Sequence, residues 1–203
     1  MLSVDFNYER PHGDGERVRD IRDGASLKRF FKLLGDKDKT PAPGVAQLEF
    51  LRWVVFQVRI GNTDAHAKNV SFFCDVRGLQ LTPTYDLVST LVLAGAGVED
   101  SLAMAIGDNF DPTKITAYDW AQLAHENNLK PRLVANELKR LANACLQALP
   151  KLTVALTQEG ADVSMMARIS DVVETQCNAA LGVAPQITKV APDLFAPTMA
   201  AAS

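Results

Sequence analysis

Residues 62–69, with the sequence NTDAHAKN, gather several side chains that could do chemistry. Asp64 and Asn69 supply a carboxylate and an amide oxygen, which are hard ligands suited to Mg²⁺. Lys68 could meet a transferring phosphate as a point charge. Asp86 follows 22 residues after Asp64, and a hairpin between them would bring it back to face Asn69. Two carboxylates, an amide and an ammonium that converge on one point suit metal-dependent phosphoryl transfer.

The spacing by itself leaves a plainer interpretation open. Loops rich in Asp and Asn are usually turns, because these side chains hydrogen-bond to nearby backbone groups. On that interpretation, residues 62–69 form a solvated turn after a helix. The flanking elements therefore decide whether Asp86 can reach the loop.

A helix is predicted immediately before this loop, over residues 45–60. Apolar residues recur there at spacings of three and four, namely Leu48, Leu51, Val55 and Val58. Gly61 ends the helix, because glycine takes a left-handed cap at little cost. After the loop, residues 70–76 and 79–83 are predicted to form two short strands, joined by a turn at residues 77–78.

The rest of the chain is predicted to be mainly helical. Ser26 is expected to cap a short helix that closes at Gly35. Residues 91–112 are rich in Gly and Asp and indicate a long loop around a short strand, Leu102–Ile106. Further helices are expected over residues 117–127, from Pro131 onward and after a capping Asp162.

Composition and charge exclude several classes of protein. The 203 residues suffice for one domain with a sizeable core, and a net charge of −3 provides no basic excess for strong unaided nucleic-acid binding. The three cysteines, Cys74, Cys145 and Cys177, form no Cys-x-x-Cys pair and are expected to be buried, reduced thiols. No signal peptide and no uninterrupted apolar run of membrane-spanning length is present. We therefore expect a cytoplasmic protein without direct DNA binding.

The order Asp64, Asn69, Asp86 resembles the protein kinase catalytic loop and its second, metal-binding Asp. More specifically, NTDAHAKN followed by LTPTYDLVST resembles the C-terminal half of the HipA family. These are serine/threonine kinases, typically toxins of bacterial toxin–antitoxin pairs. The members of the family pattern present here are Gly61, Asn62, Asp64, His66, Lys68, Asn69, Pro83, Tyr85, Asp86 and Leu87. The resemblance covers roughly residues 1–150.

The resemblance implies a role for each matched position. Asp64 would be the catalytic base that orients the substrate hydroxyl. Asn69 and Asp86 would hold Mg²⁺, and Lys68 would neutralise the γ-phosphate of ATP. His66 would brace the loop, and a hydrogen-bonded structural histidine is an equal alternative to any proton transfer.

The N-terminal residues would lie near the hinge of such a kinase. Residues 2–8 alternate loosely between apolar and polar, which predicts a strand that ends in a Gly-rich turn. By the resemblance, Asp5 and Phe6 would then contact the adenine of ATP, and residues 1–25 would form a hinge-proximal strand and turn. The family's upstream half supplies a phosphate-covering loop and a strand lysine, and neither occurs in this sequence.

The expected fold class is therefore mainly α (α+β), a protein-kinase-like C-terminal lobe. It would be a helical bundle with a short catalytic-loop β-hairpin over residues 1–183. Residues 184–203 are rich in Ala, Pro and Thr and are expected to form a mostly disordered tail.

The resemblance implies phosphoryl transfer from ATP, with Mg²⁺, to a serine or threonine of a protein, by analogy one involved in translation. A DNA-binding antitoxin and a separate N-terminal lobe are the implied partners. The missing upstream half favours an alternative, a catalytically incomplete lobe that acts as an interaction module with one of these partners, because a lone lobe exposes its inter-lobe apolar face. A metal-dependent hydrolase built on the same two carboxylates is a third reading, against which the kinase-like residue order argues.

Overall fold

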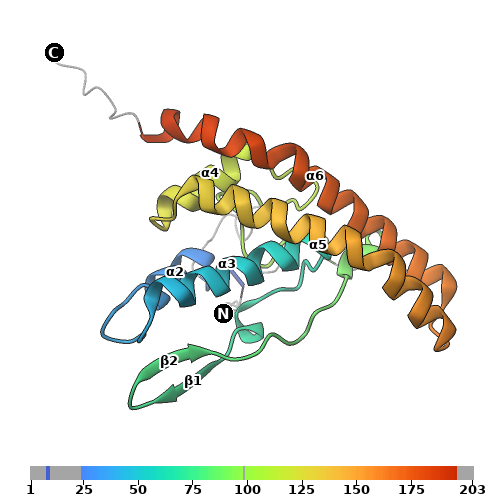
Figure 1. Cartoon of the computed structure of the whole chain (residues 1–203), viewed down its shortest axis with the longest axis horizontal. Helices are drawn as coiled ribbons and strands as arrows, with labels where there is room; N and C mark the ends of the chain where they lie inside the picture. Colours follow the sequence, from blue (N-terminus) through green and yellow to red (C-terminus); the bar gives the residue numbers. More distant parts are fainter. Residues whose placement is uncertain (1–7, 10–23, 98, 196–203) are drawn as a thin grey trace, which may run out of the picture.

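Helices dominate the computed structural model, which describes residues 8–9, 24–97 and 99–195 (Figure 1). The α-helices are α2 (Leu27–Leu34), α3 (Pro43–Arg59), α4 (Ala117–Glu126), α5 (Pro131–Gln158) and α6 (Val163–Phe195). An antiparallel hairpin consists of β1 (Phe72–Asp75) and β2 (Gly78–Leu81), with Phe72 opposite Leu81. Two short 3-10 helices, η1 (Ala67–Asn69) and η2 (Thr90–Leu93), flank the hairpin in sequence. The predicted mainly helical α+β fold is confirmed.

Local sequence signals account for most helix starts. The Ser26 hydroxyl caps α2 by accepting a backbone N–H in the first turn at 3.3 Å. Thr116 and Asp119 form a capping box at the start of α4, with the Thr116 N–H donating to the Asp119 carboxylate at 2.7 Å. Pro131 opens α5, and Asp162 caps α6 through a 2.7 Å bond from a first-turn N–H. These starts agree with those expected from the sequence.

The long antiparallel pair α5 and α6 forms one side of the molecule, and α3 lies between this pair and the hairpin (Figure 1). α4 packs mainly against α6. The largest side chains of the core come from every α-helix and include Phe31, Leu34, Phe50, Leu51, Trp120, Leu123, Leu138 and Ile187. The candidate loop thus follows a helix whose position is set by packing on both sides.

The C-terminal segment differs from the expected tail. α6 continues through Pro185 and Pro192 to Phe195, so residues 184–195 are helical. Each proline removes one backbone donor, but Ala184 and Ile187 are fully buried in the core cluster and anchor this part of the helix. Tertiary packing therefore overrides the composition up to residue 195, and the last residues lie outside those described.

The strand expected at Leu102–Ile106 is also corrected. Among the described residues it contributes only an isolated bridge between Ile106 and Asn109. Its backbone groups pair with separate segments, for example the Ala103 N–H with the Thr63 carbonyl at 2.8 Å. No second strand within the described residues lies alongside, so this buried segment fills part of the core rather than joining a sheet there.

Two further sequence expectations concern exposure. Cys177 is buried and Cys145 half-buried, but Cys74 is exposed near the tip of the hairpin, because the hairpin projects from the helices (Figure 1). Of the described helices, none has the length and apolar character needed to cross a membrane. The strand predicted over residues 2–8 falls almost entirely outside the described residues.

Candidate active site

The end of α3 sets the direction of the candidate loop. Gly61 has a φ of +69°, in the left-handed region that glycine adopts most readily. The N–H of Gly61 donates to the Val58 carbonyl at 3.2 Å, and the N–H of Asn62 donates to the Gln57 carbonyl at 2.9 Å. These are the paired bonds of a Schellman cap, which turns the chain sharply after the helix. Residues 62–69 therefore leave α3 in a defined direction.

Asn69 closes this loop from inside. Its side chain is buried, and its Nδ2 donates to the backbone carbonyl of Asp64 at 3.1 Å. The His66 N–H donates to the same carbonyl at 2.8 Å. The side chains of Asp64 and Lys68 are exposed on the outer side of the loop. The structure thus brings together the predicted base, the predicted amide ligand and the predicted phosphate-facing lysine.

Asp86 returns to the same place after the hairpin. The amide of Asn62, 1% exposed, donates through Nδ2 to the Asp86 carbonyl at 3.1 Å and accepts the Asp64 N–H at 3.1 Å through Oδ1. The buried Asn62 side chain therefore links the backbone of Asp64 to the backbone of Asp86, the two residues with the predicted site carboxylates. The return of the chain predicted from the spacing is confirmed, and the Asp86 side chain is exposed beside the loop.

Two further hydroxyl groups tie the segment around Asp86 to the loop. The Tyr85 hydroxyl donates to the Lys68 carbonyl and shares a 2.6 Å hydrogen bond with Ser71 Oγ. Thr90 Oγ1 accepts the Thr63 N–H at 2.7 Å. Sequence reasoning noted Tyr85 only as part of a pattern and missed Thr90, because neither contact follows from local spacing.

Tyr8 is a site residue that sequence reasoning missed. Its hydroxyl donates to Asp64 Oδ1 at 2.6 Å, and its ring meets the His66 ring edge-on with centroids 5.1 Å apart. Nδ1 of His66 is buried and has no hydrogen-bond partner among the described residues. The bracing role of His66 stays a prediction. Asp5 and Phe6, the predicted adenine contacts, lie outside the described residues.

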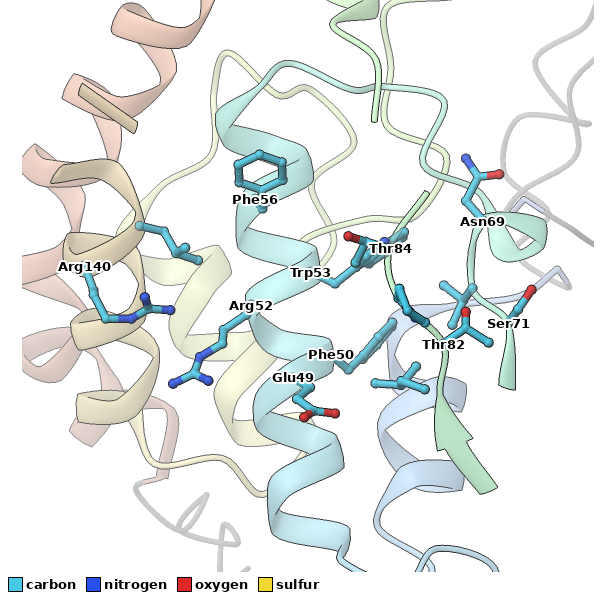
Figure 2. A pocket seen from close by; sticks show the side chains of 14 residues that line it. Glu49, Phe50, Arg52, Trp53, Phe56, Asn69, Ser71, Thr82, Thr84 and Arg140 are labelled. Atoms are coloured by element: carbon cyan, nitrogen blue, oxygen red, sulfur yellow. The ribbon is translucent and has the colours of Figure 1, made fainter. Parts of the chain in front are cut away.

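A cavity of about 510 Å³ opens beside Asn69 (Figure 2). One wall is aromatic and comes from α3, with Phe50 and Trp53 stacked at 5.5 Å. The lining residues around the other sides are Asn69, Val70, Ser71, Leu81, Thr82, Pro83, Thr84, Arg140 and Leu141. The volume is within the range of small-ligand pockets, so the loop borders a hollow on one side.

A buried carboxylate organises the α5 side of this cavity. Glu137 accepts hydrogen bonds from Arg52 Nε at 3.1 Å and from Arg140 Nη2 at 2.7 Å. Burial alone raises the pKa of Glu137, but the hydrogen bonds from the two arginines outweigh it, so the net pKa lies below the ordinary value. The cluster fixes the register of α3 against α5.

The donor set at the loop suits a hard divalent cation. The structure shows no group of three or more His, Cys, Asp or Glu side chains within the described ranges, so a metal cage made by the protein alone is not found there. Asn69 uses its nitrogen for the Asp64 carbonyl, which leaves its oxygen for a ligand. The Asp86 carboxylate is exposed, and its backbone carbonyl is joined to the loop through Asn62. An amide oxygen and one carboxylate fit Mg²⁺, which takes few protein ligands and completes its shell with phosphate and water.

The fold is mainly helical, and it presents Asp64, Asn69 five residues later and Asp86 beyond the hairpin. This arrangement defines the C-terminal lobe of a protein-kinase-like fold. Comparison with known families supports this class: the family described as the HipA-like C-terminal domain matches residues 8–149. The chain belongs to this HipA-like family.

Individual relatives agree with the family assignment. The chain is 36% identical over 190 residues to the serine/threonine-protein kinase toxin HipA of Shewanella oneidensis, covering 93% of this chain and 43% of that protein. It also superposes with a TM-score of 0.83 on a chain from a solved complex of the Shewanella oneidensis toxin–antitoxin system, HipA, HipB and operator DNA, at 36% identity. That match covers 91% of this chain and 42% of the other. The chain therefore spans less than half the length of these relatives.

Proposed function

We propose that this chain is the C-terminal lobe of a HipA-like serine/threonine kinase that transfers the γ-phosphoryl group of ATP to a protein hydroxyl. The observation that carries the proposal is the convergence of Asp64, Asn69 and Asp86, joined through the Asn62 amide and the Asn69 amide. Phosphoryl transfer depends mainly on positioning and charge stabilisation, and these backbone contacts hold the reacting groups in place. The predicted location is the cytoplasm.

Each exposed group has a distinct part in this proposal. Asp64 accepts the proton of the substrate hydroxyl as it attacks the γ-phosphorus, and the leaving group is ADP. Lys68 stabilises the negative charge that spreads over the transferring phosphoryl oxygens. Asn69 and Asp86 would hold Mg²⁺, which when bound neutralises charge on the phosphates. Tyr8 donates to Asp64 Oδ1 and leaves the second carboxylate oxygen for the incoming hydroxyl.

The test adds the part of a relative that the match to this chain does not cover. The chain is mixed with the N-terminal half of the Shewanella oneidensis HipA, and transfer from radiolabelled ATP with Mg²⁺ into bacterial extract proteins is measured. We expect label incorporation that the Asp64→Ala variant abolishes. The exposed position of Asp64 makes this variant a control that leaves the fold intact, as circular dichroism would show. Absence of transfer in the mixture and in a fused version would contradict the proposal.

A second candidate function is an interaction module without activity of its own. Large apolar side chains are exposed around the site, with Phe73 61%, Leu87 43% and Val88 43% accessible. Such a surface suits a complementary lobe or an antitoxin of the kind present in the Shewanella oneidensis complex. Sedimentation of the chain with each candidate would reveal a complex that Asp64→Ala leaves unchanged. A stable lone monomer in both mixtures would count against this candidate.

A further inference from the structure

Asn62 holds an unusual position among the residues around the site. It is only 1% exposed, and its side chain makes hydrogen bonds to three separate segments. Its Nδ2 donates to Gln57 Oε1 of α3 at 2.8 Å and to the carbonyl of Asp86 at 3.1 Å, while its Oδ1 accepts the N–H of Asp64 at 3.1 Å. A single planar amide therefore sets the distance between the two segments that present carboxylates.

Backbone groups determine which way this amide faces. The N–H of Asp64 can only donate, so it requires the oxygen of Asn62, and the carbonyl of Asp86 can only accept, so it requires the nitrogen. The second hydrogen of that nitrogen then requires an acceptor on α3, which is Gln57 Oε1. The Nε2 of Gln57 consequently faces away and is buried without a hydrogen-bond partner in the described structure. We therefore explain the unsatisfied Nε2 of Gln57 by the other end of the same side chain, the Oε1 that orients Asn62.

The backbone of Asp86 needs such support. Its φ is +55°, in the left-handed region that residues with a Cβ seldom occupy. A conformation of this kind persists only where surrounding contacts determine it, and strained residues of this kind gather at functional sites. The bond from Asn62 holds the carbonyl of this residue, and so it holds the peptide that directs the carboxylate.

We propose that Asn62 is a positioning residue that keeps Asp86 in register with Asp64, and that Gln57 orients it. The inference rests on the proposed kinase function. It assigns Asn62 no contact with substrate or nucleotide, since its side chain is buried beneath the loop. The expected consequence of breaking the link is a misplaced metal-binding carboxylate with an intact substrate surface.

Two variants separate the two halves of this link, and the complete two-lobe mixture is used for activity. Asn62→Asp keeps an oxygen for the N–H of Asp64 but removes the donor to Asp86. Asn62→Leu keeps the branched shape and the number of side-chain heavy atoms and removes all three bonds. The matched control is Asn127→Asp, because Asn127 is also a buried asparagine whose Nδ2 donates to a backbone carbonyl, at 2.8 Å, on the distant helix α4.

We expect Asn62→Asp to lower kcat about 100-fold, the effect of a misplacement of about 1 Å, and to raise the Mg²⁺ concentration for half-maximal rate at least 10-fold. The KM for protein substrate should change less than threefold. Asn127→Asp should leave both kcat and the Mg²⁺ requirement within threefold. The proposal is overturned if Asn62→Asp stays within threefold of the parent, or if the control loses as much activity.

A second measurement keeps the inference testable when activity is absent or a variant folds poorly. Hydrogen exchange at the N–H of Asp64 should accelerate at least 10-fold in Asn62→Leu and stay within threefold in Asn62→Asp.

The role of Gln57 is tested by Gln57→Met, which removes the unsatisfied donor while keeping a side chain of similar length. This variant should fold and should lose about 10-fold in kcat, less than Asn62→Asp. Equal exchange in all variants overturns the positioning role. A parent mixture without any transfer instead refutes the kinase proposal, so the two failures are distinct.

Discussion

The Schellman cap at Gly61 should be the most sensitive backbone position near the site. Gly61→Ala adds a Cβ that would lie 2.5 Å from Val172 Cγ1 and 3.1 Å from Leu91 Cβ. The left-handed conformation costs a residue with a Cβ about 1 kcal/mol, and forcing a methyl into packed side chains costs about 1–3 kcal/mol. Val172 is β-branched and stiff at χ1, so it cannot simply rotate away. We expect a loss of about 2–4 kcal/mol in the free energy of unfolding.

Urea denaturation followed by circular dichroism measures this loss. With a slope of about 3 kcal/mol per molar urea, the midpoint should fall by about 1 M. Gly95→Ala is the matched control, because Gly95 also has a positive φ, +80°, but an added Cβ meets nothing within 4 Å. Its midpoint should fall by only about 0.3 M, for a cost of about 1 kcal/mol. Equal shifts for the two variants would refute the steric reasoning and leave only the backbone conformation.

Three other perturbations test the fold and its electrostatics. Ile187→Ala should lower the free energy of unfolding by about 2–5 kcal/mol, and the exposed neighbour Thr188→Ala by less than about 0.5 kcal/mol; similar urea midpoints would show that this end of α6 is not packed. Glu137→Gln should cost about 1–3 kcal/mol near neutral pH. The folded pKa of Glu137 lies below 4.5, so the ionised carboxylate contributes fully to the free energy of unfolding above that pH, and this contribution is lost as the pH falls through the folded pKa. The difference in free energy of unfolding between parent and variant should therefore narrow in acid. A difference that does not change with pH would contradict this. Thr116→Ala should lower stability by about 1 kcal/mol through loss of the capping box, and a midpoint equal to that of the parent would contradict the cap.

Local signals explain why much of the fold could be predicted. Ser26, Asp162 and Pro131 each mark a helix start through a side-chain or backbone property of the residue itself, and the structure shows a helix after each. Gly61 ends α3 for the same reason. The segment Leu102–Ile106 was not predictable in this way, since an apolar run indicates burial but does not say whether another strand is available to pair with it.

In the candidate site, too, contacts between residues close in sequence were predictable and contacts between distant residues were not. Asp64, Lys68 and Asn69 are close in sequence and share one loop, so their proximity follows from the chain itself. The contact of Tyr8 with Asp64 joins residues 56 positions apart, and no local pattern predicts it.

The sequence by itself determined the chemical groups, the loop that holds most of them and the family to which the chain belongs, because these depend on residue type and short spacing. Only the tertiary structure decided that Asn62 is buried between the two carboxylate-bearing segments and that α6 extends to Phe195. Both outcomes depend on which distant segments remove a side chain from water, and that is settled by packing of the whole chain rather than by any one stretch of it.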